Sequence, residues 1–218
     1  MSTPSSTLRV DKLACERGHR RLFSNVSFEL SPGQWLHLEG DNGVGKTSLL
    51  RIVCGLSPAD AGEVCWQGQA IQQQAAAYRA SMFYLGHALS LKEELTALEN
   101  LLSDAAVAGR SLSHAQAVVA LARMGLRGRE HLPLRVMSQG QKRRTALARL
   151  WGSQAPLWVL DEPFVALDAK AVDGLRGLLA EHVAQGGMAL LTSHQPVNLQ
   201  RADGSAVEIK TYRLKGVS

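Results

Sequence analysis

A chain of 218 residues, 45% of them hydrophobic and 20% charged, has an ordinary globular composition, which excludes a disordered chain and fits one α/β domain. No apolar stretch approaches the roughly 20 residues that span a bilayer, the start of the chain lacks a signal-peptide pattern, and its three cysteines are too scattered for a disulfide framework or a zinc site. The net charge of +5 permits an acidic partner, but no basic run interleaved with aromatic residues predicts direct nucleic-acid binding.

The first quarter of the chain predicts strands that lead into a glycine-rich loop. Residues 8–13 and 26–30 alternate apolar and polar side chains, the period of half-buried strands. A short apolar run at 35–39 then precedes the segment G-D-N-G-V-G-K-T at 40–47, and helical spacing follows over 46–54. Strand, glycine loop and helix are the context in which G-x-x-x-x-G-K-[ST] indicates a phosphate-binding loop.

The chemistry of this loop requires these residue types. Glycines let the backbone adopt positive φ and bring its N–H groups close to phosphate oxygens, and the helix adds its N-terminal amides. Lys46 is expected to reach the β and γ phosphates and the Thr47 hydroxyl to ligate magnesium. The alternative is a glycine turn with a solvated lysine. The candidate ATP-binding residues of the loop are Gly40, Asp41, Asn42, Gly43, Val44, Gly45, Lys46, Thr47 and Ser48.

The middle of the chain predicts two further strands and a helical insertion. Residues 55–62 have loop chemistry, 63–68 read as a strand, and 81–85 as a buried strand. The spacing over 95–108 and 113–124 is helical. Later elements follow in order: Ser138 as an N-cap, a helix over 142–151, a buried strand at 157–160, a helix over 169–183, and strands at 188–191 and 207–214.

Chemically important residues follow three predicted strands. The phosphate loop follows one, Asp161 and Glu162 follow 157–160, and His194 follows 188–191. In a parallel α/β sheet these carboxyl ends meet at one edge, where ligands bind. Asp161 is then the candidate magnesium ligand, Glu162 the residue that polarises water, and His194 a γ-phosphate contact. The alternatives are solvated loop acids and a structural histidine.

Five motifs in this order resemble the ATP-binding cassette (ABC) ATPase family: the loop at 40–47, M-S-Q-G-Q at 137–141, the strand with its acids at 157–162, A-L-D at 166–168, and His194. The resemblance implies a P-loop NTPase fold of ABC ATPase type, a single nucleotide-binding domain over 1–218. It implies a mixed or parallel sheet core, an antiparallel β layer and a helical subdomain at roughly 88–150. Other P-loop folds lack the 137–141 segment.

The same resemblance implies that ATP is shared between two copies of the chain. Ser138, Gln139, Gly140 and Gln141 would contact, in trans, the ATP held by the phosphate loop of a second copy. Asp168 would lie in the D-loop between the copies, and His194 would be catalytic beside Glu162. ATP and Mg²⁺ are the implied cofactors, and an ATP-sandwich homodimer the implied assembly.

Two positions depart from the family pattern. An aromatic residue that stacks on adenine is usual near residues 15–18, where this chain offers Arg17, whose planar guanidinium stacks more weakly. His87 stands where a glutamine commonly links the site to the membrane subunit. Both are predicted to lie at the nucleotide, and the replacement of glutamine puts ordinary coupling in doubt.

These departures, with the segments at 84–87, 91–101 and 40–51, resemble ATP-binding subunits of cytochrome c maturation (Ccm) systems. The resemblance implies a peripheral ATPase on the cytoplasmic face of the bacterial inner membrane, bound to integral membrane permease subunits. It would act as a haem translocase, in haem export or release of a haem-loaded chaperone. The alternatives are an ABC ATPase for another exported substrate, a soluble cassette acting on nucleic acid or ribosomes, and a small-molecule kinase.

Overall fold

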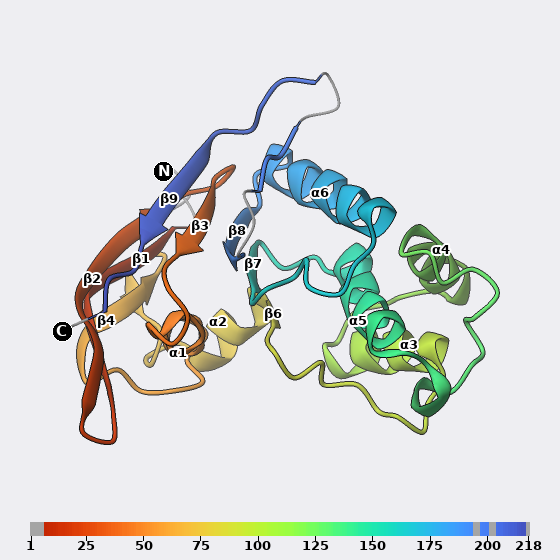
Figure 1. The fold of residues 1–218 in the computed structure, drawn as a ribbon, viewed down its shortest axis with the longest axis horizontal. Coiled ribbons are helices and arrows are strands. Elements are labelled where there is room, and N and C mark those ends of the chain that lie inside the picture. Colours follow the sequence, from red (N-terminus) through yellow and green to blue (C-terminus); the bar gives the residue numbers. More distant parts are fainter. Residues whose placement is uncertain (1–6, 194–196, 201–203, 217–218) are drawn as a thin grey trace.

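The computed structural model describes residues 7–193, 197–200 and 204–216 and contains two β-sheets (Figure 1). The antiparallel sheet has the order β2-β1-β4-β5 and consists of β1 (Leu8–Arg17), β2 (Arg20–Leu30), β4 (Ala61–Trp66) and β5 (Gln69–Ala70). The second sheet is parallel throughout, with the order β6-β7-β8-β3-β9. Its strands are β3 (Trp35–Glu39), β6 (Met82–Leu85), β7 (Leu157–Leu160), β8 (Met188–Thr192) and β9 (Ile209–Arg213).

The helices divide between the two sides of the parallel sheet (Figure 1). They are α1 (Lys46–Val53), α2 (Ala75–Ala80), α3 (Ala97–Val107), α4 (His114–Arg123), α5 (Gln139–Ala148) and α6 (Ala169–Ala184), with 3₁₀ turns η1 (Leu134–Val136) and η2 (Arg149–Gly152). Helices α3, α4 and α5 pack on one another at the end of the molecule opposite the antiparallel sheet. Among the described residues, no helix has both the length and the hydrophobicity needed to cross a bilayer.

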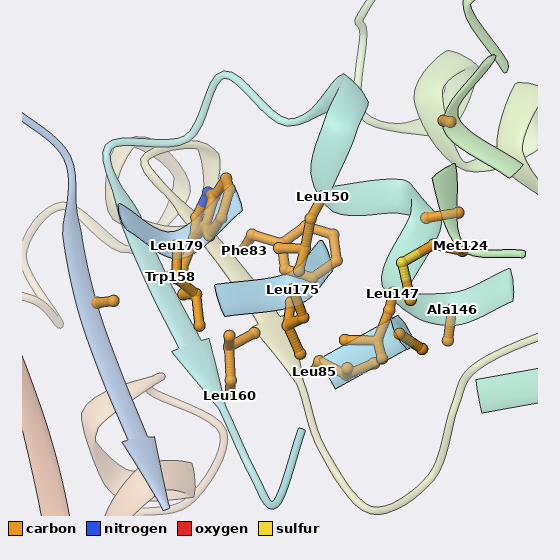
Figure 2. Close-up of a cluster of buried hydrophobic side chains, with 14 of the residues drawn as sticks. Phe83, Leu85, Met124, Ala146, Leu147, Leu150, Trp158, Leu160, Leu175 and Leu179 are labelled. Atoms are coloured by element: carbon orange, nitrogen blue, oxygen red, sulfur yellow. The ribbon is translucent and has the colours of Figure 1, made fainter. Parts of the chain in front are cut away.

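Strands β7 and β8 at the centre of the parallel sheet are buried on both faces, and alternation along each strand assigns side chains to two cores. On β7, Leu157 and Val159 face α1 and the antiparallel sheet, whereas Trp158 and Leu160 face α6 and the α3–α5 helices. Figure 2 shows the second core, in which Leu175 of α6 packs with β6, β7 and α5. Burial on both faces explains why these strands read as continuous apolar runs.

The predicted strands and long helices are confirmed, with differences at their ends. Strand β4 begins at Ala61, inside the predicted loop 55–62. Gly62 makes this possible, because a Cβ at its φ of +80° would lie 2.3 Å from the Asp11 carbonyl oxygen. Helix α2 and strand β5 were not predicted; α2 has six residues and buries only Tyr78, so its sequence carries no apolar period.

The helix predicted over 142–151 begins earlier, at Gln139, and its last turn is the 3₁₀ segment η2. Ser138 is its N-cap as predicted, and Gln141 completes a capping box. The residues from Gln139 to Arg143 include no apolar side chain, so periodicity could not show this first turn. The final strand covers Ile209–Arg213 and not the full 207–214. The boundaries of the helical subdomain, roughly 88–150, stay a prediction.

A half-buried histidine in this fold predicts lower stability in acid. His182 stacks on Trp158 with ring centroids 3.7 Å apart, and burial lowers its pKa to about 4. As pH falls below about 6.5, His182 becomes protonated in the unfolded chain but stays neutral in the folded chain until the pH nears 4. The free energy of unfolding therefore decreases by about 2 kcal/mol between pH 8 and pH 5. Urea unfolding at both pH values should show this loss. His182→Phe, which keeps the ring stack, should show a smaller pH dependence, and an equal dependence would contradict the assignment.

Candidate functional site

The loop at 40–47 leaves β3 and enters α1 through glycines that no other residue could replace without strain. Gly40, Gly43 and Gly45 have φ of +150°, +76° and +107°. A Cβ on Gly40 would lie 2.8 Å from the Leu214 carbonyl oxygen, and one on Gly45 would lie 3.0 Å from the ring of Phe23. A Cβ on Gly43 would meet nothing within 4 Å, so that glycine faces open space. The loop is therefore packed on one side and open on the other.

The open side is positively polarised. Lys46, 9% exposed, donates from Nζ to the backbone carbonyls of Gly40 and Asp41 at 2.6 and 3.1 Å. Helix α1 begins at Lys46 with Gly45 as its N-cap, without a side-chain cap and without an acidic residue in its first turn. Its first N–H groups and its dipole therefore act on the cleft without a counter-charge from the helix itself, which favours an anion there.

The Asp161 carboxylate faces the loop and is held by two hydroxyls. Thr47 Oγ1 donates to Oδ2 at 2.8 Å, and Thr192 Oγ1 donates to Oδ1 at 2.8 Å. Asp161 is 4% exposed, and burial of an ionised carboxylate requires such partners. The ends of β7 and β8 thus meet the phosphate loop at one sheet edge, as the sequence predicted.

The next residue, Glu162, has a strained backbone. Its φ is +51°, a region that costs a non-glycine residue on the order of 1 kcal/mol and persists only where the surroundings impose it. Its backbone N–H donates to Thr192 Oγ1 at 2.8 Å, and its carbonyl accepts from Arg143. Both peptide groups are fixed, so the direction of the Glu162 side chain is set by the fold.

These residues line one cleft of about 530 Å³. Its walls contain six of the nine predicted loop residues, both acids and His87, and also Leu22, which the sequence did not indicate. The predicted loop residues Gly40, Asp41 and Val44 are absent from the lining. The full lining is Leu22, Asn42, Gly43, Gly45, Lys46, Thr47, Ser48, His87, Asp161 and Glu162. Neither a pocket of about 380 Å³ beside Cys54 and Tyr78 nor one of about 610 Å³ beside Phe83 and Arg149 contains a predicted site residue. The cleft at the sheet edge is therefore the candidate active site.

Other predicted residues lie outside this cleft. Ser138 and Gln139 are exposed at the start of α5 and, with Gly140 and Gln141, are absent from its lining. Asp168 is the N-cap of α6, and the Ala171 backbone N–H, followed by Arg144, holds its pKa below the ordinary value. Arg17 is exposed at the β1–β2 turn, also away from the cleft lining. His194 lies outside the described residues.

Comparison with known proteins decides the family. The family model described as ABC transporter matches residues 23–165. The cytochrome c biogenesis ATP-binding export protein CcmA of Dechloromonas aromatica is 54% identical over 88% of this chain and 94% of that protein. Its namesake in Escherichia coli strain K12 is 48% identical over 88% of this chain and 91% of that protein.

Solved structures agree. An ATP-binding subunit of an ABC transporter superposes with a TM-score of 0.75 at 28% identity, covering 86% of this chain and 79% of that one. A bacterial ABC transporter cassette determined as a dimer superposes with a TM-score of 0.76 at 20% identity, covering 92% and 97% of the two chains. The chain belongs to the ABC transporter ATP-binding family. The predicted fold class is confirmed, and the shared activity of this ABC family is ATP binding and hydrolysis.

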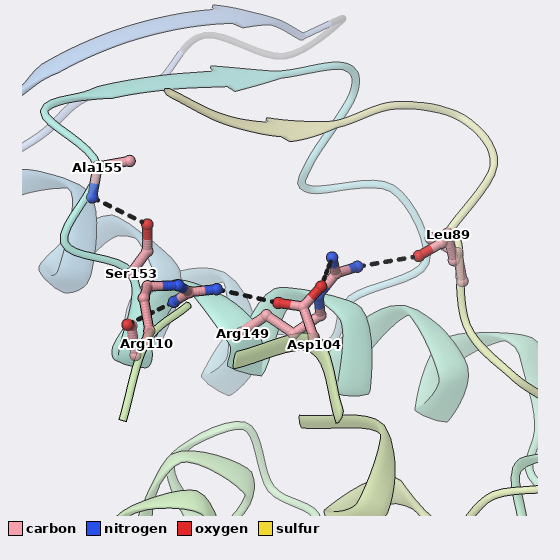
Figure 3. A network of polar contacts seen from close by, with 7 residues as sticks. Leu89, Asp104, Arg110, Arg149, Ser153 and Ala155 are labelled. Carbon is pink, nitrogen blue, oxygen red and sulfur yellow. Dashed lines mark hydrogen bonds and ion pairs between the residues drawn. The ribbon is translucent and has the colours of Figure 1, made fainter. Parts of the chain in front are cut away.

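In this ABC ATPase, the segment that carries His87 is fixed by an ionic network (Figure 3). Arg149 donates to the carbonyl of Leu89 at 3.3 Å and pairs with Asp104 of α3. Asp104 also pairs with Arg110 at 3.1 Å. The side chains of this network are no more than 24% exposed, so its pairs are less screened by solvent than surface pairs. His87 therefore reaches the cleft from a segment anchored to the helical region.

The placement of His87 predicts a graded mutational response. It is exposed and lines the cleft, so a side chain there can report on the nucleotide to a bound partner. His87→Gln should keep most partner-stimulated ATPase activity, because an amide also donates and accepts hydrogen bonds. His87→Ala should lower it about tenfold, the cost of about one hydrogen bond to a charged group. His19→Ala, at the exposed β1–β2 turn, is the control. Equal stimulation in His87→Ala and in the unmodified chain would exclude the role.

Besides Leu22, two residues that hold the acidic turn were missed in the sequence. Thr192 contacts both Asp161 and Glu162, and Arg143 holds the Glu162 carbonyl. Thr192 stands at the end of a predicted apolar strand. Its hydroxyl at that strand end was a usable signal, because Asp161 and Glu162 follow a neighbouring predicted strand. Arg143 stands among other basic residues on α5, and only its burial distinguishes it.

Proposed function

We propose that this chain is the ATP-hydrolysing subunit of a membrane ABC complex in c-type cytochrome biogenesis, energising haem export or the release of a haem-loaded chaperone. The names of relatives 48–54% identical to it support this proposal over another exported substrate or a nucleic-acid-associated cassette. The observation that carries the ATPase part is the cleft in which Lys46, Thr47, Asp161 and Glu162 converge.

The donors in the cleft fit a Mg²⁺ complex of ATP. Thr47 Oγ1 and Asp161 Oδ2, now joined by a hydrogen bond of 2.8 Å, are hard oxygen atoms that would hold the ion. Within the described part of the chain, no group of three or more acidic, histidine or cysteine side chains could hold a metal alone, so the phosphates would complete the coordination. When bound, Mg²⁺ supplies positive charge that offsets the charge developing on the phosphate oxygens.

Different residues of this chain then bind the phosphates and accept the proton. Lys46 and the first N–H groups of α1 bind the β and γ phosphates and stabilise the charge that grows during transfer. Glu162 accepts a proton from the attacking water, with its orientation fixed by the bonds to Thr192 and Arg143. His194 is proposed as a further γ-phosphate contact, and Arg17 as a weak adenine stack.

A second copy completes the site. Ser138 and Gln139 are exposed and outside the cleft of their own chain, so Ser138, Gln139, Gly140 and Gln141 are proposed to close over ATP held by the partner copy. Two exposed apolar side chains, Val136 at 64% and Val165 at 51%, lie beside the signature and the Asp168 loop, where such a pair would bury them. The dimeric ABC cassette with the same fold supports this arrangement.

The membrane partner is proposed to be the integral permease of the Ccm complex, with this chain peripheral on the cytoplasmic face of the inner membrane. The test uses a host bacterium that lacks the chain and is complemented with the unmodified or the Lys46→Ala protein. The unmodified chain should restore covalent haem in periplasmic c-type cytochromes and co-purify with hydrophobic subunits in detergent, while Lys46→Ala should not restore it. Haem proteins of b type are the control. Normal c-type cytochromes without the chain would contradict the proposal.

A further inference from the structure

A buried arginine connects the signature segment to the acidic turn of the same chain. Arg143, on α5, is 8% exposed and lies one and a half helical turns beyond Ser138. Its Nη2 donates to the carbonyl of Asp161 at 3.0 Å and to the carbonyl of Glu162. One guanidinium therefore holds both backbone carbonyls at the turn that carries the proposed magnesium ligand and the proposed base.

Stability alone does not explain this arginine. Burial lowers its pKa, because desolvation penalises the charged form, yet a guanidinium stays protonated in proteins. Within the described part of the chain, its buried Nε has no hydrogen-bond partner. The desolvation cost of a buried charge can exceed the gain from its partners, so the burial of this guanidinium is weak evidence of a stabilising role. Its contacts converge on the turn at Glu162, where φ is +51°, so orientation of that turn is the better explanation.

Two further contacts hold the rest of the 161–168 segment against α5. Arg144 Nη2 lies 2.7 Å from Asp168 Oδ2 at the far end of the segment. In between, Gly140 lies so close to the Ala166 carbonyl oxygen that a Cβ would stand 3.1 Å from it. The segment thus follows α5 along its whole length, and a shift of the signature end of α5 must shift the turn.

We propose that Arg143 is a positioning residue that couples the seating of the signature at 138–141 to the orientation of Glu162 in the same chain. The inference rests on the proposed function, because the signature is taken to contact ATP on the partner copy. Arg143 then transmits the occupancy of the partner's phosphate loop to the base of its own chain. Each site hydrolyses ATP at its full rate only when the other site holds ATP. The rate therefore depends cooperatively on the ATP concentration.

The test compares Arg143→Met and Arg143→Lys in the full chain, purified with the membrane subunits that accompany it. Arg143→Met should lower kcat about 100-fold, the usual cost of misplacing a reacting group by about 1 Å. KM should change less than about twofold, and the Hill coefficient for ATP should fall toward one. Arg143→Lys should be intermediate, because an ammonium does not reproduce the guanidinium fork.

Arg176→Met is the matched control, because Arg176 on α6 also has a buried Nε without a partner among the described residues. It should leave kcat and the Hill coefficient unchanged. Adding Arg143→Met to Glu162→Gln should slow turnover no further, since both changes disable the same step. If Arg143→Met fails to fold, Arg143→Lys decides on the same two quantities.

The outcomes separate this inference from the proposed function. An unmodified complex that does not hydrolyse ATP refutes the proposed function. A complex that hydrolyses ATP, with kcat and the Hill coefficient unchanged by the Arg143 substitution, overturns only the positioning role. A lower melting temperature with weaker ATP binding and an unchanged Hill coefficient would show a merely structural arginine and would also overturn it.

Discussion

Replacing Lys46 with alanine is expected to lower ATP turnover by at least about 100-fold, the usual loss when one donor to a developing oxyanion is removed. The physical reason is that, among the described residues that line the cleft, Lys46 is the only lysine or arginine. ATP affinity should also weaken, because a charge-assisted hydrogen bond to phosphate is lost. Phosphate release and equilibrium binding of a fluorescent ATP analogue measure the two effects.

The control for this change is Lys210→Ala, because Lys210 on β9 is exposed, donates to the Glu29 carbonyl and is absent from the cleft lining. Lys46 also holds the carbonyls of Gly40 and Asp41. The melting temperature of Lys46→Ala must therefore be compared with that of the unmodified chain. Turnover near that of the unmodified chain in a folded Lys46→Ala protein would refute the phosphate-loop assignment.

Glu162→Gln is expected to trap an ATP-bound pair of chains. The amide keeps the shape of the side chain but cannot accept a proton from water, so hydrolysis should slow by about 100- to 10,000-fold while ATP stays bound. The backbone bonds to Thr192 and Arg143 do not involve the side chain and should persist. Sedimentation with MgATP should show a dimer that disappears when ATP is removed.

Two further variants test the geometry of this pair. Adding Ser138→Arg should disperse the dimer, because Ser138 is exposed and the substitution places bulk and charge against the partner's nucleotide. Glu181→Gln, a change to an exposed acid on α6, should neither slow hydrolysis nor produce a dimer. A Glu162→Gln protein that stays monomeric with ATP, alone and with its membrane partner, would contradict the mechanism.

Local sequence determined the elements that build the site. The apolar run of β7 has no polar face, so it predicted a central parallel strand, and parallel strands bring their carboxyl ends to one edge. The glycines of the phosphate loop and the capping residue Ser138 act through their own backbone conformation and nearest neighbours. Such features need no knowledge of distant contacts, and the sequence predicted them.

Long-range packing decided the rest. Arg143 reads as one of several basic residues on α5, and only the packing of that helix against the end of β7 buries it beside Glu162. Thr192 lies 31 positions from Asp161 in the sequence and is joined to it by a hydrogen bond. The positive φ of Glu162 likewise comes from bonds supplied by β8 and α5. These constraints depend on which elements meet in space. The hydrophobic periodicity of a single segment does not show which other elements it contacts.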